Sequence, residues 1–174
     1  MLVERGRTWL TAVIPIVVAL STVGCSGDQA GDITGPSGGS GSGNLSSVTV
    51  SAADLAFCVS ETNRHRTSVG VGALAQAADL EAFALAAARA DHASGVAHDY
   101  FSANATGLAS ENMVLRSPLS GNVGSLITAA LAAFWAEGPG GVHHDNMRDP
   151  RWRRVGCGIH IEGDQVTLAQ EFRP

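Results

Sequence analysis

The feature that most constrains the fold is a change of hydrophobic period in the last third of the chain. In residues 123–135 the apolar side chains recur every three or four positions, which predicts one continuous apolar face of a helix. Glycines and a proline at 138–141 end that helix. In residues 155–171 apolar residues alternate with other residues on both sides of Gly163-Asp164, which predicts a β-hairpin with a two-residue turn.

Two more helices and a strand are predicted upstream of this segment. Ser51 and Asp54 have the spacing of a capping box, so a first helix starts there and ends before the glycines at 70 and 72. A second, alanine-rich helix is predicted at about residues 76–94, and a short strand at about 112–115. Helices packed on a small antiparallel sheet make an α+β domain.

The N-terminus has the pattern of an export signal rather than of a folded segment. Arg5 and Arg7 precede an apolar stretch from Trp9 to Leu20. That stretch is shorter than the roughly 20 apolar residues that cross a bilayer, and it is typical of the apolar region of a signal peptide. We therefore predict a signal over residues 1–25.

The predicted signal ends at Cys25, which follows Gly24 as in a bacterial lipobox. We predict that Cys25 is acylated and anchors the protein to the membrane, and Ser26 after it favours the outer membrane of a Gram-negative cell. Thr22 stands where a lipobox usually has leucine, so an ordinary cleaved signal and an uncleaved anchor are the alternatives. The expected location is outside the cytoplasm, as a lipoprotein of the outer membrane or cell surface, or as a secreted protein.

Composition divides the remainder into a linker and one domain. Residues 26–47 are rich in glycine and serine, which predicts a flexible linker that holds the globular domain, residues 48–174, away from the membrane. The chain has a formal net charge of −5, and its longest basic cluster is Arg151, Arg153 and Arg154. A cluster this short is typical of a solvated edge, so no nucleic-acid partner is expected.

Two cysteines, Cys58 and Cys157, remain if Cys25 is acylated. Both lie on predicted apolar faces, one of a helix and one of a strand. Export permits a disulfide between them, and two buried free thiols are the alternative. Neither cysteine is expected to be a nucleophile.

The six histidines are the first candidates for chemistry: His65, His92, His98, His143, His144 and His160. A lone histidine is more often a surface or core residue than a ligand. Imidazoles that the fold brings close to carboxylates can bind zinc or move protons. No two histidines have the short spacing of a zincin helix, so a local metalloprotease motif is excluded.

Short motifs follow one another along residues 55–172: Asn63-Arg64-His65-Arg66 with Val69-Gly70-Val71, His98-Asp99-Tyr100-Phe101, Ser110-Glu111-Asn112-Met113, Phe134-Trp135-Ala136-Glu137, and His143 to Gly158. Their order and joint spacing resemble the CAP superfamily, also called the SCP/PR-1/antigen 5 family, in its bacterial form. Ser110 replaces the glycine of the family's Gly-Glu-Asn motif, and Glu137 is one position earlier after Trp135 than in the family pattern.

The resemblance implies an α-β-α sandwich whose central cleft carries two histidines and two glutamates. Matched residue by residue, the four are His98, Glu111, Glu137 and His143. They would hold a divalent metal, with zinc as the first choice. His92 competes for the first of these positions and His144 for the last.

Ordinary structural roles compete with these assignments. Glu111 is also placed to cap a strand or to pair with Arg116, and Asn146 is expected to tie its loop to backbone groups. Two further expectations are solvent exposure for His144 and His160 and core positions for Trp135 and Trp152.

The resemblance implies the fold more securely than an activity. We predict an exported, membrane-tethered, non-enzymatic module that binds a small ligand, a lipid or an extracellular protein, with a His/Glu cleft able to hold the metal. No catalytic residue is assigned. The alternative is a metal-dependent hydrolase or protease, in which His98 and His143 hold the ion and Glu111 or Glu137 is the general base. A structural envelope protein is the third hypothesis.

Overall fold

A computed structural model describes residues 48–174. The predicted signal 1–25 with Cys25 and the predicted linker 26–47 lie outside the described residues. The described chain forms five helices and four strands: α1 Ala52–Ser68, β1 Ala75–Gln76, α2 Ala78–Ser94, α3 Asp99–Asn104, β2 Ser110–Pro118, α4 Val123–Ala136, α5 Val142–Arg148, β3 Arg154–Glu162 and β4 Gln165–Arg173.

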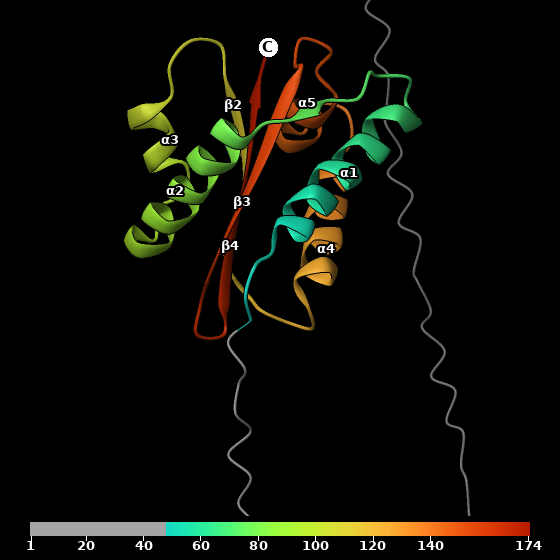
Figure 1. The fold of residues 1–174 in the computed structure, drawn as a ribbon. Coiled ribbons are helices and arrows are strands. Elements are labelled where there is room, and N and C mark those ends of the chain that lie inside the picture. The colour runs from blue at the N-terminus through green and yellow to red at the C-terminus, as the bar shows by residue number, and fades with distance from the viewer. Residues whose placement is uncertain (1–47) are drawn as a thin grey trace, which may run out of the picture. The chain divides into compact units, whose positions relative to one another are not determined.

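The four strands form one sheet that lies between two groups of helices (Figure 1). α2 packs on β3 and β4 across one face of the sheet, and α3 lies beside α2. α1, α4 and α5 pack together on the other face. The predicted α+β class and its α-β-α sandwich are therefore confirmed.

The sheet has the strand order β1-β3-β4-β2. β3 and β4 form the predicted hairpin around Gly163-Asp164, and β2 pairs antiparallel with the other side of β4. β1 pairs parallel with β3, so the sheet is mixed rather than purely antiparallel as predicted. Two residues are too few to show a hydrophobic period. Backbone hydrogen bonds instead place β1, from Ala75 N to Arg153 O and from Ala77 N to Val155 O.

Local signals start and end the long helices close to where the sequence predicts. Ser51 Oγ accepts from Asp54 N at 3.2 Å and Asp54 Oδ2 accepts from Ser51 N at 2.8 Å, so the predicted capping box of α1 is confirmed. Asn122 caps α4 by accepting from Ser125 N. α2 ends at Gly95, whose φ of 76° is the left-handed conformation that favours glycine after a helix.

The sequence pattern does not predict α3 or α5. These helices have six and seven residues, about two turns, so no repeated apolar face can be recognised. Asn146 lies in α5 and bonds a backbone group as expected, but that group lies in β2 rather than nearby in the chain. Its Nδ2 donates to Asn112 Oδ1 at 2.9 Å and to Glu111 O at 3.3 Å, both in β2. The short helix α5 is thus fixed by tertiary contacts.

The two faces of β3 carry side chains of very different size. Cys157 and its apolar neighbours join the main core with residues of α1 and α4, and Trp152 is buried there as expected. On the opposite face, Gly156 and Gly158 allow α2 to approach the strand. A Cβ at either glycine would overlap the backbone of α2. Buried alanines of α2 complete this close contact.

Two long-range connections hold α1 and α5 in place on the face of the sheet opposite to α2. Cys58 of α1 and Cys157 of β3 form a disulfide between residues that are 99 positions apart. The buried Arg66 of α1 donates through Nη1 to Met147 O at 2.7 Å and to Asp149 O at 3.0 Å, at the end of α5. None of the helices within residues 48–174 is long and apolar enough to cross a membrane.

Candidate functional site

His98 and Glu111 form the first of two histidine–glutamate pairs, with His98 Nδ1 at 2.7 Å from Glu111 Oε1. Glu111 lies at the start of β2 and its side chain is 1% exposed, whereas the His98 side chain is 40% exposed. His98 precedes α3 with a φ of 65°, a left-handed conformation that is strained for a residue with a Cβ. Such strain concentrates at functional sites. The pair combines a buried carboxylate with an accessible imidazole.

Glu137 and His143 form the second pair. Glu137 caps the C-terminus of α4, and His143 lies in the first turn of α5. Glu137 Oε1 is 2.5 Å from His143 Nδ1, and Glu137 Oε2 accepts from His143 N at 3.0 Å. The hydrogen bond to the His143 ring holds the pKa of Glu137 below its usual value. Phe134 stacks on the His143 ring at 4.7 Å between centroids. The orientation of this imidazole is therefore fixed by both partners.

The start of β2 connects the two pairs. Asn112 Nδ2 donates to His143 O at 3.1 Å, and Asn146 Nδ2 donates to Glu111 O at 3.3 Å. The first pair therefore contains Glu111, and the second pair is bonded to its neighbour Asn112. The four residues matched to the family cleft are brought to one end of an edge strand, as two pairs.

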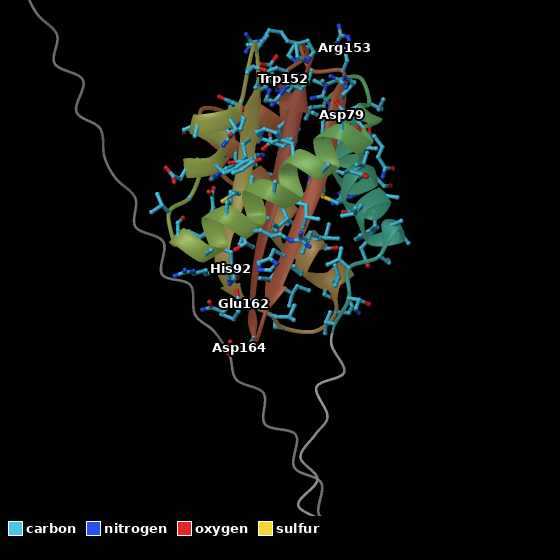
Figure 2. All side chains as sticks on the ribbon, turned by 60° about the vertical axis from the view of Figure 1, so that its left-hand side comes forward. Asp79, His92, Trp152, Arg153, Glu162 and Asp164 are labelled. Carbon is cyan, nitrogen blue, oxygen red and sulfur yellow. A yellow bond between two sulfur atoms is a disulfide. The ribbon has the colours of Figure 1, made fainter. Side chains whose placement is uncertain are left out.

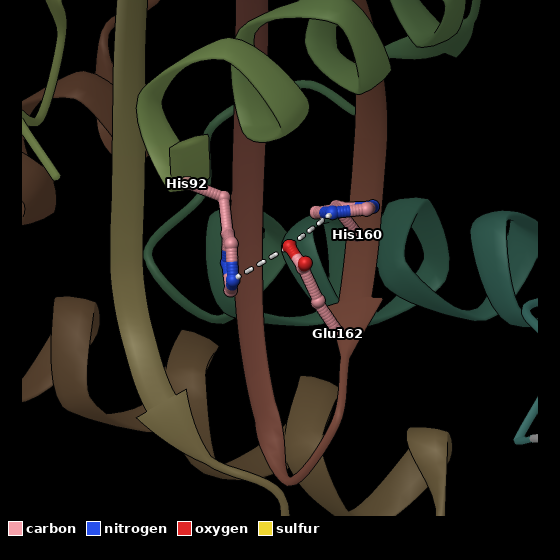
Figure 3. A group of neighbouring side chains, drawn as sticks. All are labelled: His92, His160 and Glu162. Atoms are coloured by element: carbon pink, nitrogen blue, oxygen red, sulfur yellow. Dashed lines mark ion pairs between the residues drawn. The ribbon is translucent and has the colours of Figure 1, made fainter. Parts of the chain in front are cut away.

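The four do not form a compact ligand set by themselves. Within residues 48–174, only one group places three histidine, cysteine or acidic ligand atoms within 4.8 Å of one another: His92, His160 and Glu162 (Figure 3). His92, the competitor of His98, thus belongs to a different cluster. This cluster lies at the hairpin end of the sheet.

Other sequence assignments are settled by the packing. His144 is buried with its ring 4.5 Å from that of Trp135, so the expectation that it faces solvent is wrong. The reason is that α5 turns this side chain toward α4, where Trp135 packs against the core. Arg116 does not pair with Glu111, because its guanidinium donates to the carbonyls of His92 and Ala93.

Glu171 is a residue of the site that sequence reasoning did not identify. It lies on β4 directly opposite Glu111, and both residues are buried. Glu171 Oε1 and Glu111 Oε2 have no donor from other groups of residues 48–174. A proton on Glu171 allows its carboxyl to donate to Glu111. The signal for this pairing is strand register, which a hydrophobic pattern does not specify.

Burial is the main reason why both carboxyls titrate unusually. Burial, followed by the hydrogen bond and negative charge of Glu111, raises the pKa of Glu171 to about 9, although Arg173 opposes the shift. Burial also raises the pKa of Glu111, against the hydrogen bond from Glu171. Two buried carboxyls on directly opposite strand positions cannot both ionise easily, because their negative charges repel each other. The pair therefore holds one proton at neutral pH.

The shared proton predicts a specific pH dependence of stability for Glu171→Gln. The folded pKa of Glu171 lies above its ordinary value of 4.5, so its full contribution is present below pH 4.5 and is lost as pH rises toward 9. In this window the parent should lose up to about 1.4 kcal/mol of unfolding free energy per pH unit through this one group. A glutamine donates to Glu111 without titrating, so the variant should lose this slope.

Urea unfolding of parent and Glu171→Gln at pH 5, 7 and 8.5, with EDTA present, measures the difference between the two slopes. Glu61→Gln, on the outer helix α1, is the matched control and should run parallel to the parent. Parallel curves for Glu171→Gln would show that the two carboxyls do not share a proton.

Comparison with known proteins identifies the family of the chain. The family model described as CAP, the cysteine-rich secretory protein family, matches residues 59–172, more than half of the chain. The chain belongs to the CAP family. Proteins of this family are extracellular or secreted. No curated protein sequence matches the chain significantly.

Two solved structures share the fold of this chain at low sequence identity. NaASP2 with Zn²⁺ is 16% identical with a TM-score of 0.57, over 71% of this chain and 80% of that one. BmVAL-1 is 15% identical with a TM-score of 0.57, over 74% and 80%. An extracellular protein containing an SCP domain from Bacillus anthracis is 15% identical with a TM-score of 0.49, over 69% of this chain and 40% of that one.

Proposed function

We propose that this CAP protein is an exported, membrane-tethered binding module that holds a divalent metal through His98 and His143. The observation that carries the proposal is the hydrogen bonding of both imidazoles. In each one Nδ1 faces a glutamate, at 2.7 Å for His98 and 2.5 Å for His143. The second ring nitrogen, Nε2, is then the atom left to bind a ligand.

This donor set fits zinc or a similar ion. Histidines that ligate metals typically donate their other N–H to a carboxylate, which fixes the tautomer and orients the ring. Glu111 and Glu137 are the carboxylates that accept this second N–H from His98 and His143. The proton that Glu171 shares with Glu111 keeps Glu111 able to accept from His98. A bound ion would supply a Lewis acid and an anchoring point for an oxygen or nitrogen of a ligand. The Zn²⁺ of the similar NaASP2 structure supports this choice of ion.

The exposure of the pairs supports a binding role. The side chains of His98 and His143 are 40% and 27% exposed, so a ligand from outside can reach both. Candidate ligands are a small molecule, a lipid or an extracellular protein. The predicted signal with Cys25 and the predicted linker 26–47 support export and tethering to the membrane.

The first test is zinc binding by the double variant His98→Gln/His143→Gln. Loss of a second-shell partner alone costs ten- to 100-fold in metal affinity, so loss of both ligands should cost about 100-fold or more. Isothermal titration of the full chain with zinc measures the lost binding event. Glu81→Gln, which changes a glutamate that faces Gln76 and belongs to neither histidine–glutamate pair, is the control and should retain this event. Unchanged zinc binding in the double variant would refute the assignment.

One observation favours the alternative of a metal-dependent hydrolase. Burial raises the pKa of Glu111, and carboxyls with raised pKa values are suited to general acid–base catalysis. A panel of peptides and esters tests this with the zinc-loaded chain. Hydrolysis that is lost in both His98→Gln and Glu111→Gln would establish the enzyme and replace the binding module. No hydrolysis by the zinc-loaded parent supports the binding module.

A further inference from the structure

We propose that His92, His160 and Glu162 form a second divalent-metal site, which is independent of the two histidine–glutamate pairs. His92 lies near the C-terminus of α2, and the other two residues lie near the end of β3 (Figure 3). Figure 2 shows His92, Glu162 and Asp164 together near the hairpin turn, whereas Trp152 and Arg153 lie at the opposite end of the sheet.

The spacing of the three ligand atoms suits a tetrahedral ion. Glu162 Oε2 lies 3.5 Å from His92 Nε2 and 3.6 Å from His160 Nε2, and all three ligand atoms lie within 4.8 Å of one another. Nitrogen and oxygen ligands at zinc distances of about 2.0–2.1 Å lie about 3.3 Å apart in a tetrahedron. Small side-chain rotations therefore bring the three atoms to coordinating distance. The Glu162 side chain is 70% exposed and free to make them.

A buried hydroxyl lies next to the ring of His92. His92 Nδ1 is 2.8 Å from Thr167 Oγ1, which also accepts from Arg116 N at 3.1 Å. A hydroxyl can donate as well as accept, so this contact is compatible with either tautomer of a neutral His92. A cation at Nε2 would select the tautomer in which Nδ1–H donates to Thr167 Oγ1. Burial, followed by the positive charge of His160, lowers the pKa of His92, so the ring is neutral and able to bind a metal at neutral pH.

The charged side chains around the cluster favour a cation. A hollow of about 520 Å³ adjoins the cluster, and its charged side chains are Arg116, Glu162 and Asp164. The Arg116 guanidinium opposes a cation, but it is held on the carbonyls of His92 and Ala93. The two carboxylates outweigh that charge. The hollow also leaves room for water as a fourth ligand, as in zinc sites with three protein ligands.

The donor set selects the class of metal. Two imidazoles and one carboxylate suit zinc and similar first-row ions, whereas calcium and magnesium require mainly oxygen ligands. With a cation at His92 Nε2, Thr167 would be the second-shell acceptor for His92 Nδ1–H, as at known histidine–metal sites. The rival explanation is an ordinary hydrogen-bonded cluster in which Glu162 pairs with a protonated His160.

The deciding experiment uses the full chain with His98→Gln/His143→Gln, so that zinc at the other proposed site is removed. In calorimetry, this variant should bind one zinc ion per chain. When cobalt(II) replaces zinc, the visible absorption spectrum should be that of a tetrahedral cobalt ion. Adding His160→Gln or Glu162→Gln should weaken binding about 100-fold or more. Both side chains are partly or largely exposed, so these variants preserve the fold better than a change at the buried His92.

Glu81→Gln is the matched control, because this glutamate of α2 faces Gln76 rather than a histidine. It should leave the zinc affinity unchanged. Absence of zinc binding in the His98→Gln/His143→Gln chain, or binding that His160→Gln and Glu162→Gln do not weaken, would overturn the second site. Failure of the first site is seen separately, since His160→Gln alone would then abolish all zinc binding.

Discussion

Gly158→Ala is expected to destabilise the domain by about 3 kcal/mol or more, which is at or beyond the usual upper range for overpacking. The added Cβ would overlap the backbone of Ala84 and Leu85 in α2. Backbone atoms in the middle of a helix cannot rotate away as a flexible side chain can. The whole helix would have to move off β3, and the buried alanine contacts of α2 would be lost.

Urea unfolding followed by circular dichroism measures this effect. Gly72→Ala is the matched control, because a Cβ at Gly72 meets no atom within 4 Å and its φ is not in the left-handed region. The control should be neutral or up to about 1 kcal/mol more stable, since alanine restricts the unfolded chain. A Gly158→Ala variant within experimental error of the parent would show that α2 does not pack on β3 as described.

Loss of the disulfide is the second large effect that we expect. Cys58→Ala/Cys157→Ala should lower the unfolding free energy by about 4–5 kcal/mol, because a bond that closes a loop of this length restricts the unfolded chain strongly. The two residues are 99 positions apart, and both are fully buried. The bond also joins α1 to the central hairpin, so its loss loosens the layer that carries α5.

Each single variant, Cys58→Ala and Cys157→Ala, supplies the control for this prediction. Both remove the same bond, so each should approach the double variant in its urea midpoint. Parent protein unfolded with reductant should also approach that midpoint. A disulfide between these residues would be contradicted if the two single substitutions lowered the urea midpoint by amounts that add up to the effect of the double variant. It would also be contradicted if reductant left the midpoint of the parent unchanged. Such a bond persists in an oxidising compartment, in agreement with the extracellular character of the family.

The long elements of the fold could be predicted because each carries its own local signal. The capping box at Ser51 starts α1, the apolar face of residues 123–135 defines α4, and Gly163-Asp164 turns the hairpin. β1, α3 and α5 have no such signal, because two to seven residues show no period. They form where the surrounding structure offers hydrogen bonds, such as those from Asn146 to β2.

The residues of the candidate site were likewise predicted only in part from the sequence. Resemblance to the CAP family pointed to His98, Glu111, Glu137 and His143 as a set, and the structure arranges them as two pairs. Glu137, which is one position closer to Trp135 than in the family pattern, lies just after the end of α4 at Ala136, and its side chain reaches His143. No sequence signal indicated Glu171, because its partner was known only once β2 and β4 were in register.

The sequence by itself determined the helix–hairpin order, the alternation of glycines with apolar residues in β3 and the family to which the chain belongs. These properties depend on residue type and short-range spacing. Only the tertiary structure decided which side chains meet, such as His92 with Thr167 across 75 positions, and Glu111 with Glu171 across β2 and β4. Strand register and helix packing create such contacts, and they also set the burial that raises the pKa of Glu171 and lowers that of His92.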